Sequence, residues 1–188
     1  MVIGEDADTQ MEPFAQDLIV EEYEVGIVSE SEKEDMMRFY SRNSTPFTDF
    51  EECYKKNGDD WNGNTWRKDE DGVWREYSRY NPDAHWDWYE IGGRWAGKIV
   101  VKEGVEYVKP NFSWGWPEDD KRKVLEQRRT DTALLKDIEN VEHLSAYAVV
   151  MDGSWIDNGY EDMPKERIQK IIEGLDPDTR ITFIDCHF

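Results

Sequence analysis

The chain has 188 residues, of which 38% are hydrophobic and 35% charged, and its formal net charge is −20 at pH 7. The length fits a single domain, and nine Trp, nine Tyr and seven Phe residues exclude an intrinsically disordered chain. The sequence has no apolar run of about 18 residues and no basic, apolar leader, so we expect neither a membrane span nor a signal peptide and predict a cytosolic protein.

The first part of the chain is predicted to combine an irregular start with a strand and a helix. Residues 1–16 show no regular alternation, so we expect an irregular acidic leader. The stretch 18–28 alternates β-branched or aromatic residues with acidic ones, which predicts a half-buried strand. Ser29 and Glu32 match a capping box and predict a helix over about 30–42.

The middle of the chain is predicted to be rich in β-structure. Asp71-Gly72, flanked by Trp residues, is typical of a hairpin turn. Residues 97–110 have the pattern of two strands joined at Glu103-Gly104. We therefore expect a Trp-rich β insertion at about 60–116.

The last third of the chain alternates helices and strands. In order, the sequence predicts a helix from Pro117 to about Arg129 that resumes near 132–138, strands at 146–151 and 154–156, a helix over 164–175 and a strand over 180–188. The order of these elements predicts an α+β fold in which an antiparallel or mixed sheet carries helices on one face. A ferredoxin-like arrangement of the outer segments is one fold that fits this pattern. We expect residues 17–188 to form one domain.

Trp residues are concentrated in the middle of the chain, where eight of the nine lie within residues 61–116. The densest segment is 85–97. If the start of this segment is extended, Trp86 and Trp88 share one face of the strand and Asp87 lies on the other face. One face could then pack while the other contacts a ligand.

Gly92-Gly93 and Arg94 follow this aromatic run. The glycines permit positive φ angles or close backbone approach, and an arginine can bind a carboxylate or a phosphate through two parallel hydrogen bonds. Aromatic walls, an arginine and acidic groups favour a nucleotide-like ligand. The candidate ligand-binding residues are Trp86, Asp87, Trp88 and Arg94. The alternative is structural: the Trp residues fill the core, and Arg94 pairs with a nearby acid such as Asp87 or Glu90.

Few residues indicate catalysis or metal binding. Asp185 and His187 alternate on the last predicted strand, and they would have to meet the 85–87 segment to form a metal or acid/base cluster, which the sequence cannot show. Cys53 and Cys186 have neither disulfide nor zinc spacing and are expected to be reduced thiols. Glycine-rich phosphate loops and nucleophile elbows are absent from the sequence. We therefore assign no catalytic residue, metal ligand or cofactor, and an enzyme is not the favoured interpretation.

Over half of the negative charge lies near the start of the sequence. Residues 1–35 hold twelve Asp or Glu residues against one base, Lys33, which gives a net charge of −11. Such a surface repels phosphate backbones, so direct binding to nucleic acid is not expected. It attracts basic grooves on other proteins, including grooves that normally hold nucleic acid. The alternative is a solvated, solubilising acidic segment.

Two sequence motifs resemble a group of known proteins. The first is N-P-x-A-x-W-D-W-Y-x-x-G-G-R-W-x-G over residues 81–97, and the second is T-F-I-D-C-H-F over residues 182–188. With shorter matches around 22–26, 131–139 and 147–150, they resemble an uncharacterised family of bacteriophage and prophage proteins over most of the chain. The resemblance implies a phage or prophage source and transfers no activity to any residue. The acidic start of the chain and the Lys/Arg-rich stretch near Lys121 to Arg129 depart from the pattern, and these differences leave the choice of partner open.

The charge distribution, the candidate ligand-binding segment and the resemblance lead to two hypotheses about function, which belong to different classes. The first is a phage-encoded acidic accessory protein that binds and inhibits a host nucleic-acid-handling or defence complex in the bacterial cytosol, as a DNA mimic of the anti-CRISPR kind. Its partner would be a host protein with a basic surface, such as a ribonucleoprotein, without membrane contact. The candidate partner-binding residues are Glu21, Glu22, Glu24, Glu30, Glu32, Glu34 and Asp35. The alternative is a binder or enzyme that acts on a nucleotide-like small molecule through the His85–Arg94 segment.

Overall fold

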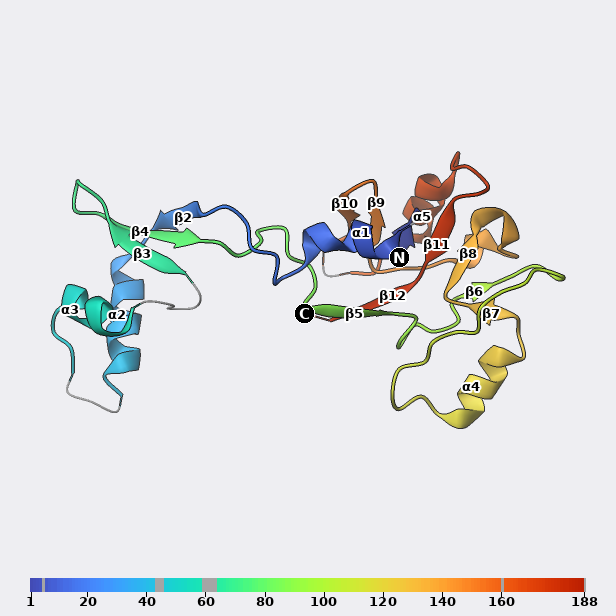
Figure 1. Ribbon diagram of the computed structural model, residues 1–188, viewed down its shortest axis with the longest axis horizontal. Coiled ribbons are helices and arrows are strands. Elements are labelled where there is room, and N and C mark those ends of the chain that lie inside the picture. Colours follow the sequence, from blue (N-terminus) through green and yellow to red (C-terminus); the bar gives the residue numbers. More distant parts are fainter. Residues whose placement is uncertain (5, 43–45, 59–63, 160, 188) are drawn as a thin grey trace. The chain divides into compact units, whose positions relative to one another are not determined.

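The computed structural model describes residues 1–4, 6–42, 46–58, 64–159 and 161–187. Trp61 of the predicted insertion and Phe188 of the second motif lie outside the described residues. The chain forms two compact units, in which unit 1 consists of residues 1–16 and 83–188 and unit 2 consists of residues 17–82 (Figure 1). Unit 2 is therefore an insertion in the sequence of unit 1. These boundaries differ from the predicted single domain because the start of the chain packs with its C-terminal half.

Unit 1 is built on a mixed sheet with the strand order β10-β9-β1-β11-β8. These strands are β1 (Val2–Ile3), β8 (Thr132–Leu134), β9 (Val149–Met151), β10 (Ser154–Ile156) and β11 (Arg180–Thr182). Strand β1 is parallel to β9 and antiparallel to β11. The predicted α+β class and the mixed sheet are confirmed.

The start of the chain is not the irregular leader that the sequence predicts. Residues 1–16 contain β1, the helix α1 (Ala7–Met11) and the 3-10 turn η1 (Glu12–Phe14). Val2 and Ile3 are fully buried at the centre of the sheet. A strand of two apolar residues is too short to show alternation, so pattern analysis does not detect it.

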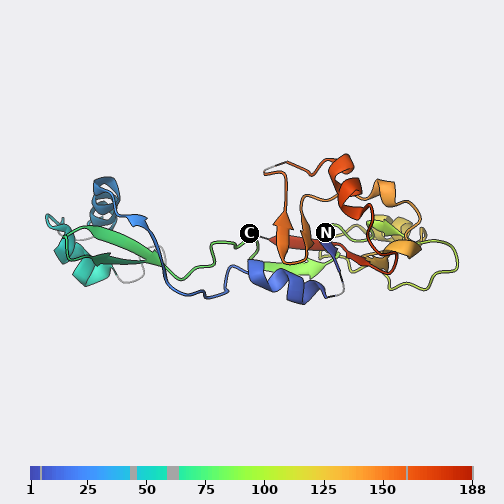
Figure 2. The ribbon, with the colours of Figure 1, turned by 90° about the horizontal axis from the view of Figure 1, so that it is seen from above.

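Helices cover both faces of this sheet, whereas the sequence predicts helices on one face. Ile3 packs in one cluster with Ile168 of helix α5 (Lys165–Ile172). Val2 lies in a second cluster with Met11 of α1. Adjacent residues of a strand point to opposite faces, and since both β1 residues are apolar, each face needs a cover. Figure 2 shows α1 and α5 on opposite sides of the strands.

The centre of the sheet can be compared with the ferredoxin-like arrangement. Strand β1 lies between β9 and β11, just as the first strand of a ferredoxin-like sheet lies between two later strands. The neighbour of β1 in that fold is the second strand of its hairpin. Here the neighbour is β9, the first strand of the β9–β10 hairpin. In that fold both neighbours are antiparallel to the first strand, whereas here β9 is parallel to β1, so the strand directions and the order of connection both differ.

Smaller elements complete unit 1. They are the strand pair β5 (Trp88–Ile91) and β12 (Ile184–His187), the pair β6 (Ile99–Val100) and β7 (Arg129–Thr130), the helix α4 (Glu118–Leu125), and the 3-10 turns η2 (Leu135–Asp137) and η3 (Val141–His143).

Two predictions of secondary structure in this part of the chain are wrong. Residues 105–110 form no strand, because β6 pairs with β7 instead of the segment that follows it. The predicted helix at 132–138 is β8 and η2, because residues 132–134 pair with β11.

Unit 2 is a three-stranded antiparallel sheet with the order β2-β4-β3 and two helices packed on one face. Its elements are β2 (Tyr23–Ile27), α2 (Glu30–Tyr40), α3 (Phe50–Asn57), β3 (Thr65–Lys68) and β4 (Trp74–Ser78). Met36 of α2 and Trp66 of β3 are buried in its core. The capping box of Ser29 and Glu32 and the hairpin at Asp71-Gly72 are confirmed. Among the described residues of both units, no helix combines the length and the apolar character that crossing a membrane requires.

Candidate functional site

The Gly92-Gly93-Arg94 motif forms a turn after β5 that holds the carboxylate of Asp185 on β12. The backbone nitrogen of Arg94 donates to Asp185 Oδ2 at 2.8 Å, and Nε and Nη2 of Arg94 donate to Oδ1 at 2.9 and 2.5 Å. The Asp185 side chain is fully buried, whereas that of Arg94 is 54% exposed. The structural alternative correctly gives Arg94 an acidic partner, but the acid is Asp185 and neither Asp87 nor Glu90.

The electrostatics of this pair favour the ionised acid. Burial raises the pKa of Asp185, but the hydrogen bonds and the positive charge of Arg94 outweigh the burial, so the pKa lies below its ordinary value. The pair therefore links the two sequence motifs, 81–97 and 182–188, through one buried charge.

A second buried carboxylate, that of Asp131, lies against the same turn. Its two oxygens accept hydrogen bonds from the backbone N–H groups of Gly97 and Asn111, each at 2.6 Å. Burial raises the pKa of Asp131, and the two N–H groups offset part of this rise. A Cβ atom at Gly92 would lie 2.3 Å from Asp131 Oδ2, and one at Gly93 would lie 2.7 Å from the Cβ of Asp185. Only glycine fits between these two acids.

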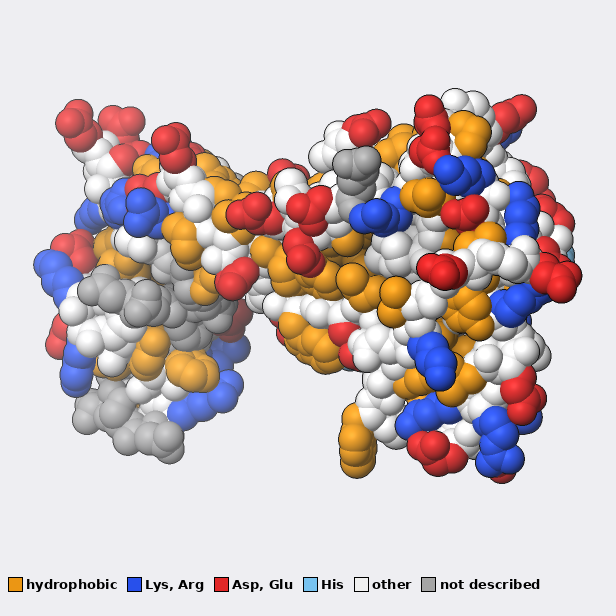
Figure 3. Space-filling view, turned by 45° about the vertical axis from the view of Figure 1, so that its right-hand side comes forward, with side chains coloured by type: hydrophobic (Ala, Val, Ile, Leu, Met, Phe, Trp, Pro, Cys, Tyr) orange, Lys and Arg blue, Asp and Glu red, His pale blue; other side chains and the backbone are white. Residues whose placement is uncertain are grey.

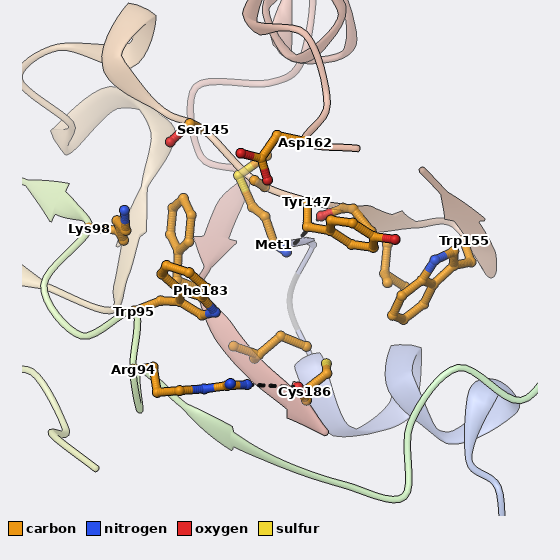
Figure 4. A pocket seen from close by; sticks show the side chains of 14 residues that line it. Met1, Arg94, Trp95, Lys98, Ser145, Tyr147, Trp155, Asp162, Phe183 and Cys186 are labelled. Atoms are coloured by element: carbon orange, nitrogen blue, oxygen red, sulfur yellow. Dashed lines mark hydrogen bonds between the residues drawn. The ribbon is translucent and has the colours of Figure 1, made fainter. Parts of the chain in front are cut away.

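A pocket of about 330 Å³ opens beside this turn, within unit 1 (Figure 4). Its wall comes from three stretches of sequence, at residues 94–98, 145–162 and 183–186, together with Met1. The aromatic residues that line it are Trp95, Tyr147, Trp155 and Phe183. Most of the remaining lining is apolar, so the pocket offers ring-shaped ligands an apolar surface with a few polar groups.

Charged side chains lie at different sides of this pocket. Figure 4 shows Arg94 and Cys186 along one side, with Tyr147 and Asp162 on the opposite side. The Lys98 ammonium lies 5.2 Å from the centroid of the Trp95 ring, which places a cation over an aromatic wall. The site therefore offers cationic groups at Arg94 and at Lys98 and a carboxylate on the side opposite Arg94.

Cys186 is the one cysteine among the residues that line the pocket. Burial is the main cause that raises the pKa of its thiol to about 11. A thiol with this pKa is protonated at neutral pH, and the protonated form is a poor nucleophile. The raised pKa therefore does not favour covalent catalysis by this side chain.

The pocket contains one of the four predicted ligand-binding residues. Arg94 lines it, whereas Trp86, Asp87 and Trp88 lie outside its wall. Trp86 packs beside α1 and donates from Nε1 to the backbone oxygen of Met11 at 2.9 Å. Trp88 stacks on His187 with a centroid distance of 3.9 Å. The predicted alternation fails because a bend at Asp87 separates Trp86 from β5.

The pocket's other contributors were not identified from the sequence. Trp95 and Lys98 lie just after the motif, and Trp155 follows the tight turn between β9 and β10. The concentration of Trp residues was a usable signal for Trp95. Tyr147 and Phe183 carry no such signal, because only the tertiary fold brings them to the same cavity.

The two histidine-containing segments do meet, but their side chains have different partners. Strand β12 pairs with β5, so that His187 is opposite Trp88. His187 Nε2 lies 3.8 Å from Asp185 Oδ2. His85 instead stacks on Trp155, with a centroid distance of 4.4 Å. Within the part of the chain that the structure describes, no three His, Cys, Asp or Glu side chains are placed to hold a metal ion.

The seven candidate partner-binding carboxylates all lie in unit 2. Five of them bind side chains of their own unit: Glu22 with Arg67, Glu24 with Arg75, Glu30 with Lys33, Glu32 with Ser29 and Asp35 with Arg38. The Glu22–Arg67 pair has two parallel hydrogen bonds, at 2.6 and 2.7 Å. On the face of the molecule in Figure 3, acidic and basic side chains are interspersed. Partial neutralisation therefore weakens the expected resemblance to a phosphate backbone.

Comparison with protein-family models, curated proteins and solved structures finds no match to this chain. The fold and the site thus define an α+β protein of two units, one of which carries an aromatic-walled pocket.

Proposed function

We propose that unit 1 binds a small, planar organic anion of the nucleotide type in the pocket beside Arg94. The observation that carries this proposal is the wall itself, in which aromatic side chains and two cations, Arg94 and Lys98, surround about 330 Å³. Pockets of this size and character are typical of small-molecule sites. The proposed role is that of a binding protein.

The pocket favours a particular orientation of such a ligand. Nε and Nη2 of Arg94 donate to Asp185 and to the backbone oxygen of Cys186, so we assign the anion to Nη1 of Arg94 and to the Lys98 ammonium. The ring system lies against Trp95 and Trp155. Asp162 lies on the side opposite Arg94 and accepts hydrogen bonds from an amino or hydroxyl group.

The charge of Lys98 provides the sharpest test. We expect adenosine 5′-monophosphate to quench Trp fluorescence, and Lys98→Glu to weaken its binding by about tenfold or more, because the change reverses one charge at the anion end. Neutral adenosine should bind both forms with similar affinity. Titrations at low salt, followed by fluorescence, measure these differences.

Lys109→Glu is the matched control, since it makes the same charge change at an exposed residue outside the pocket. Equal losses of affinity in the Lys98 and Lys109 variants would show that only net charge matters. Titrations without any change in fluorescence or in heat, for the whole set of purine and pyrimidine monophosphates, would refute the small-molecule function.

We also propose, as a second function, that unit 2 binds a basic host protein and blocks a nucleic-acid-handling or defence complex. The observation that favours this function is charge: residues 17–82 contain 17 acidic and 9 basic side chains, a net charge of −8. Glu21 and Glu34 are exposed and add to this surface. The proposal includes a phage or prophage origin of the protein and its location in the host bacterial cytosol.

Neutralising the acidic side chains tests this second function. A variant with Glu21, Glu22, Glu24, Glu30, Glu32 and Glu34 changed to Gln should lose capture of a host nucleic-acid-binding protein, while the wild-type complex should dissociate as salt rises. A control variant changes six exposed glutamates of unit 1 to Gln: Glu103, Glu106, Glu126, Glu142, Glu166 and Glu173. Unchanged capture by the first variant, measured by affinity purification with mass spectrometry, would contradict the proposal.

A further inference from the structure

Strand β2 forms one edge of the unit 2 sheet, with β4 as its partner on the inner side. Ile27 is opposite Arg75, and the backbone nitrogen of Val28 donates to Trp74 O at 2.9 Å. In an antiparallel ladder, successive residues direct their N–H and C=O groups to opposite sides. Since Val28 faces β4, the N–H and C=O of Ile27 face the open edge.

Apolar side chains along this edge are exposed to solvent. Val25 and Ile27 of β2 are 50% and 63% exposed, and Ile19, four residues before the strand begins, is 65% exposed. Natural edge strands are usually protected by charges, bulges or a covering segment. Here a bulge at Glu24/Gly26 and glutamates are present, but the three apolar side chains lie among them uncovered. The edge therefore combines an open ladder position with an apolar row.

The charge around this edge selects the kind of partner. Residues 17–35 contain eight carboxylates. Even when five basic side chains are counted with them, carboxylates outnumber basic side chains by eight to five; these five are Lys33, Arg38, Arg67, Arg75 and Arg79. An approaching acidic or neutral strand gains nothing from this field, whereas a basic strand is attracted to it.

We propose that β2 binds an extended, basic segment of another protein by strand addition. The incoming segment pairs with the backbone of Ile27, places alternate apolar side chains on Val25 and Ile27, and directs its Lys or Arg residues at the surrounding glutamates. This inference rests on the second function proposed above and adds the mode of contact, which a purely electrostatic attraction does not require.

A designed peptide tests the mode of contact. The probe is a fluorescein-labelled octapeptide of alternating Lys and Val, compared with a peptide of the same composition in which four Lys precede four Val. We expect the alternating peptide to bind at least about tenfold more tightly, because only alternation puts all valines on one face of a strand. Fluorescence anisotropy at two salt concentrations measures both affinities.

Two variants of Ile27 locate the contact. Ile27→Pro removes the outward N–H while leaving the inner ladder in place, since proline is tolerated where the N–H of an edge strand faces solvent. It should weaken the alternating peptide about tenfold, whereas Ile27→Thr, which keeps the N–H and β-branching, should bind within about threefold of wild type. If the Pro variant does not fold, Ile27→Lys tests the same edge by charge repulsion.

Equal affinity for the two peptides, wild-type binding by the Pro or Lys variant, or no binding of either peptide would each overturn strand addition. Equal, salt-sensitive binding would still be compatible with the second function, because charge attraction alone produces it. A different result would contradict the second function itself: capture of the host protein that is unchanged by the six Glu→Gln substitutions.

Discussion

Gly92→Ala is expected to destabilise unit 1 by about 4 kcal/mol, a large fraction of the roughly 5–15 kcal/mol by which an ordinary domain is stable. A residue with a side chain is strained at the φ of +81° found here. The added Cβ would also lie 2.3 Å from Asp131 Oδ2 and 2.6 Å from the backbone oxygen of Asn111. Moving Asp131 away breaks its buried hydrogen bonds, each of which costs about 1–3 kcal/mol when a donor is left unpaired. Urea denaturation followed by circular dichroism measures the loss.

Gly104→Ala separates backbone strain from steric overlap. Gly104 has nearly the same φ, +82°, and no atom lies within 4 Å of the position of its Cβ. We expect this variant to lose only about 1 kcal/mol, the cost of the backbone conformation alone. If the two variants are equally stable, the two-acid turn does not constrain residue 92 as described.

Arg94→Met is expected to lose about 3 kcal/mol at pH 7, because it leaves the fully buried Asp185 without its charged partner. The backbone N–H of residue 94 can still donate to Asp185, but the bonds from Nε and Nη2 are lost. The Met side chain retains most of the apolar stem of Arg94. A urea melt at constant pH measures the change.

The pH dependence of this loss has a definite sign. In the wild type, the pKa of Asp185 lies below the unfolded value of about 3.9, so its stabilising effect is present above that value and is lost as the pH falls through the folded pKa. In Arg94→Met, burial is opposed only by the backbone N–H of residue 94 and by His187, so the pKa of Asp185 rises above its wild-type value. The variant should therefore regain stability on protonation, and its deficit against the wild type should be smaller at pH 5 than at pH 7.

A double variant completes this test. Arg94→Met with Asp185→Asn removes the buried charge, and we expect it to be more stable at pH 7 than Arg94→Met alone. A double variant that is less stable, or a deficit that does not change between pH 5 and pH 7, would show that Asp185 is not held as an ionised, buried partner of Arg94.

Local features of the fold could be predicted from the sequence. The capping box of Ser29 and Glu32, the hairpin turn at Asp71-Gly72 and the apolar spacing of α5 depend on residues a few positions apart. Their physical causes, which are backbone capping, turn geometry and helical periodicity, act within one element. The sequence therefore predicts the type of each of these elements correctly, whereas the predicted ends differ from the observed ones by a few residues.

Features that depend on distant partners could not be predicted in the same way. Strand β1 has no recognisable pattern, and it is a strand because Val150 and Thr182 pair with it on either side. Arg94 was expected to bind an acid, but nothing in the sequence indicates that Asp185 comes closer than Glu90. The pocket could not be predicted for the same reason, because its wall consists of residues near 95, 147 and 183, which only the completed sheet brings together.

The placement of β1 also affects the order in which the chain can fold during synthesis. Unit 2 is a continuous segment, so all of its strands and helices have been made once Pro82 leaves the ribosome. Val2 and Ile3 must wait for Val150 and Thr182, and pairings across such distances form late. A nascent chain therefore carries a complete unit 2 while the apolar residues of β1 are still unpaired. The period in which it is most exposed to aggregation ends only when β9 and β11 have emerged.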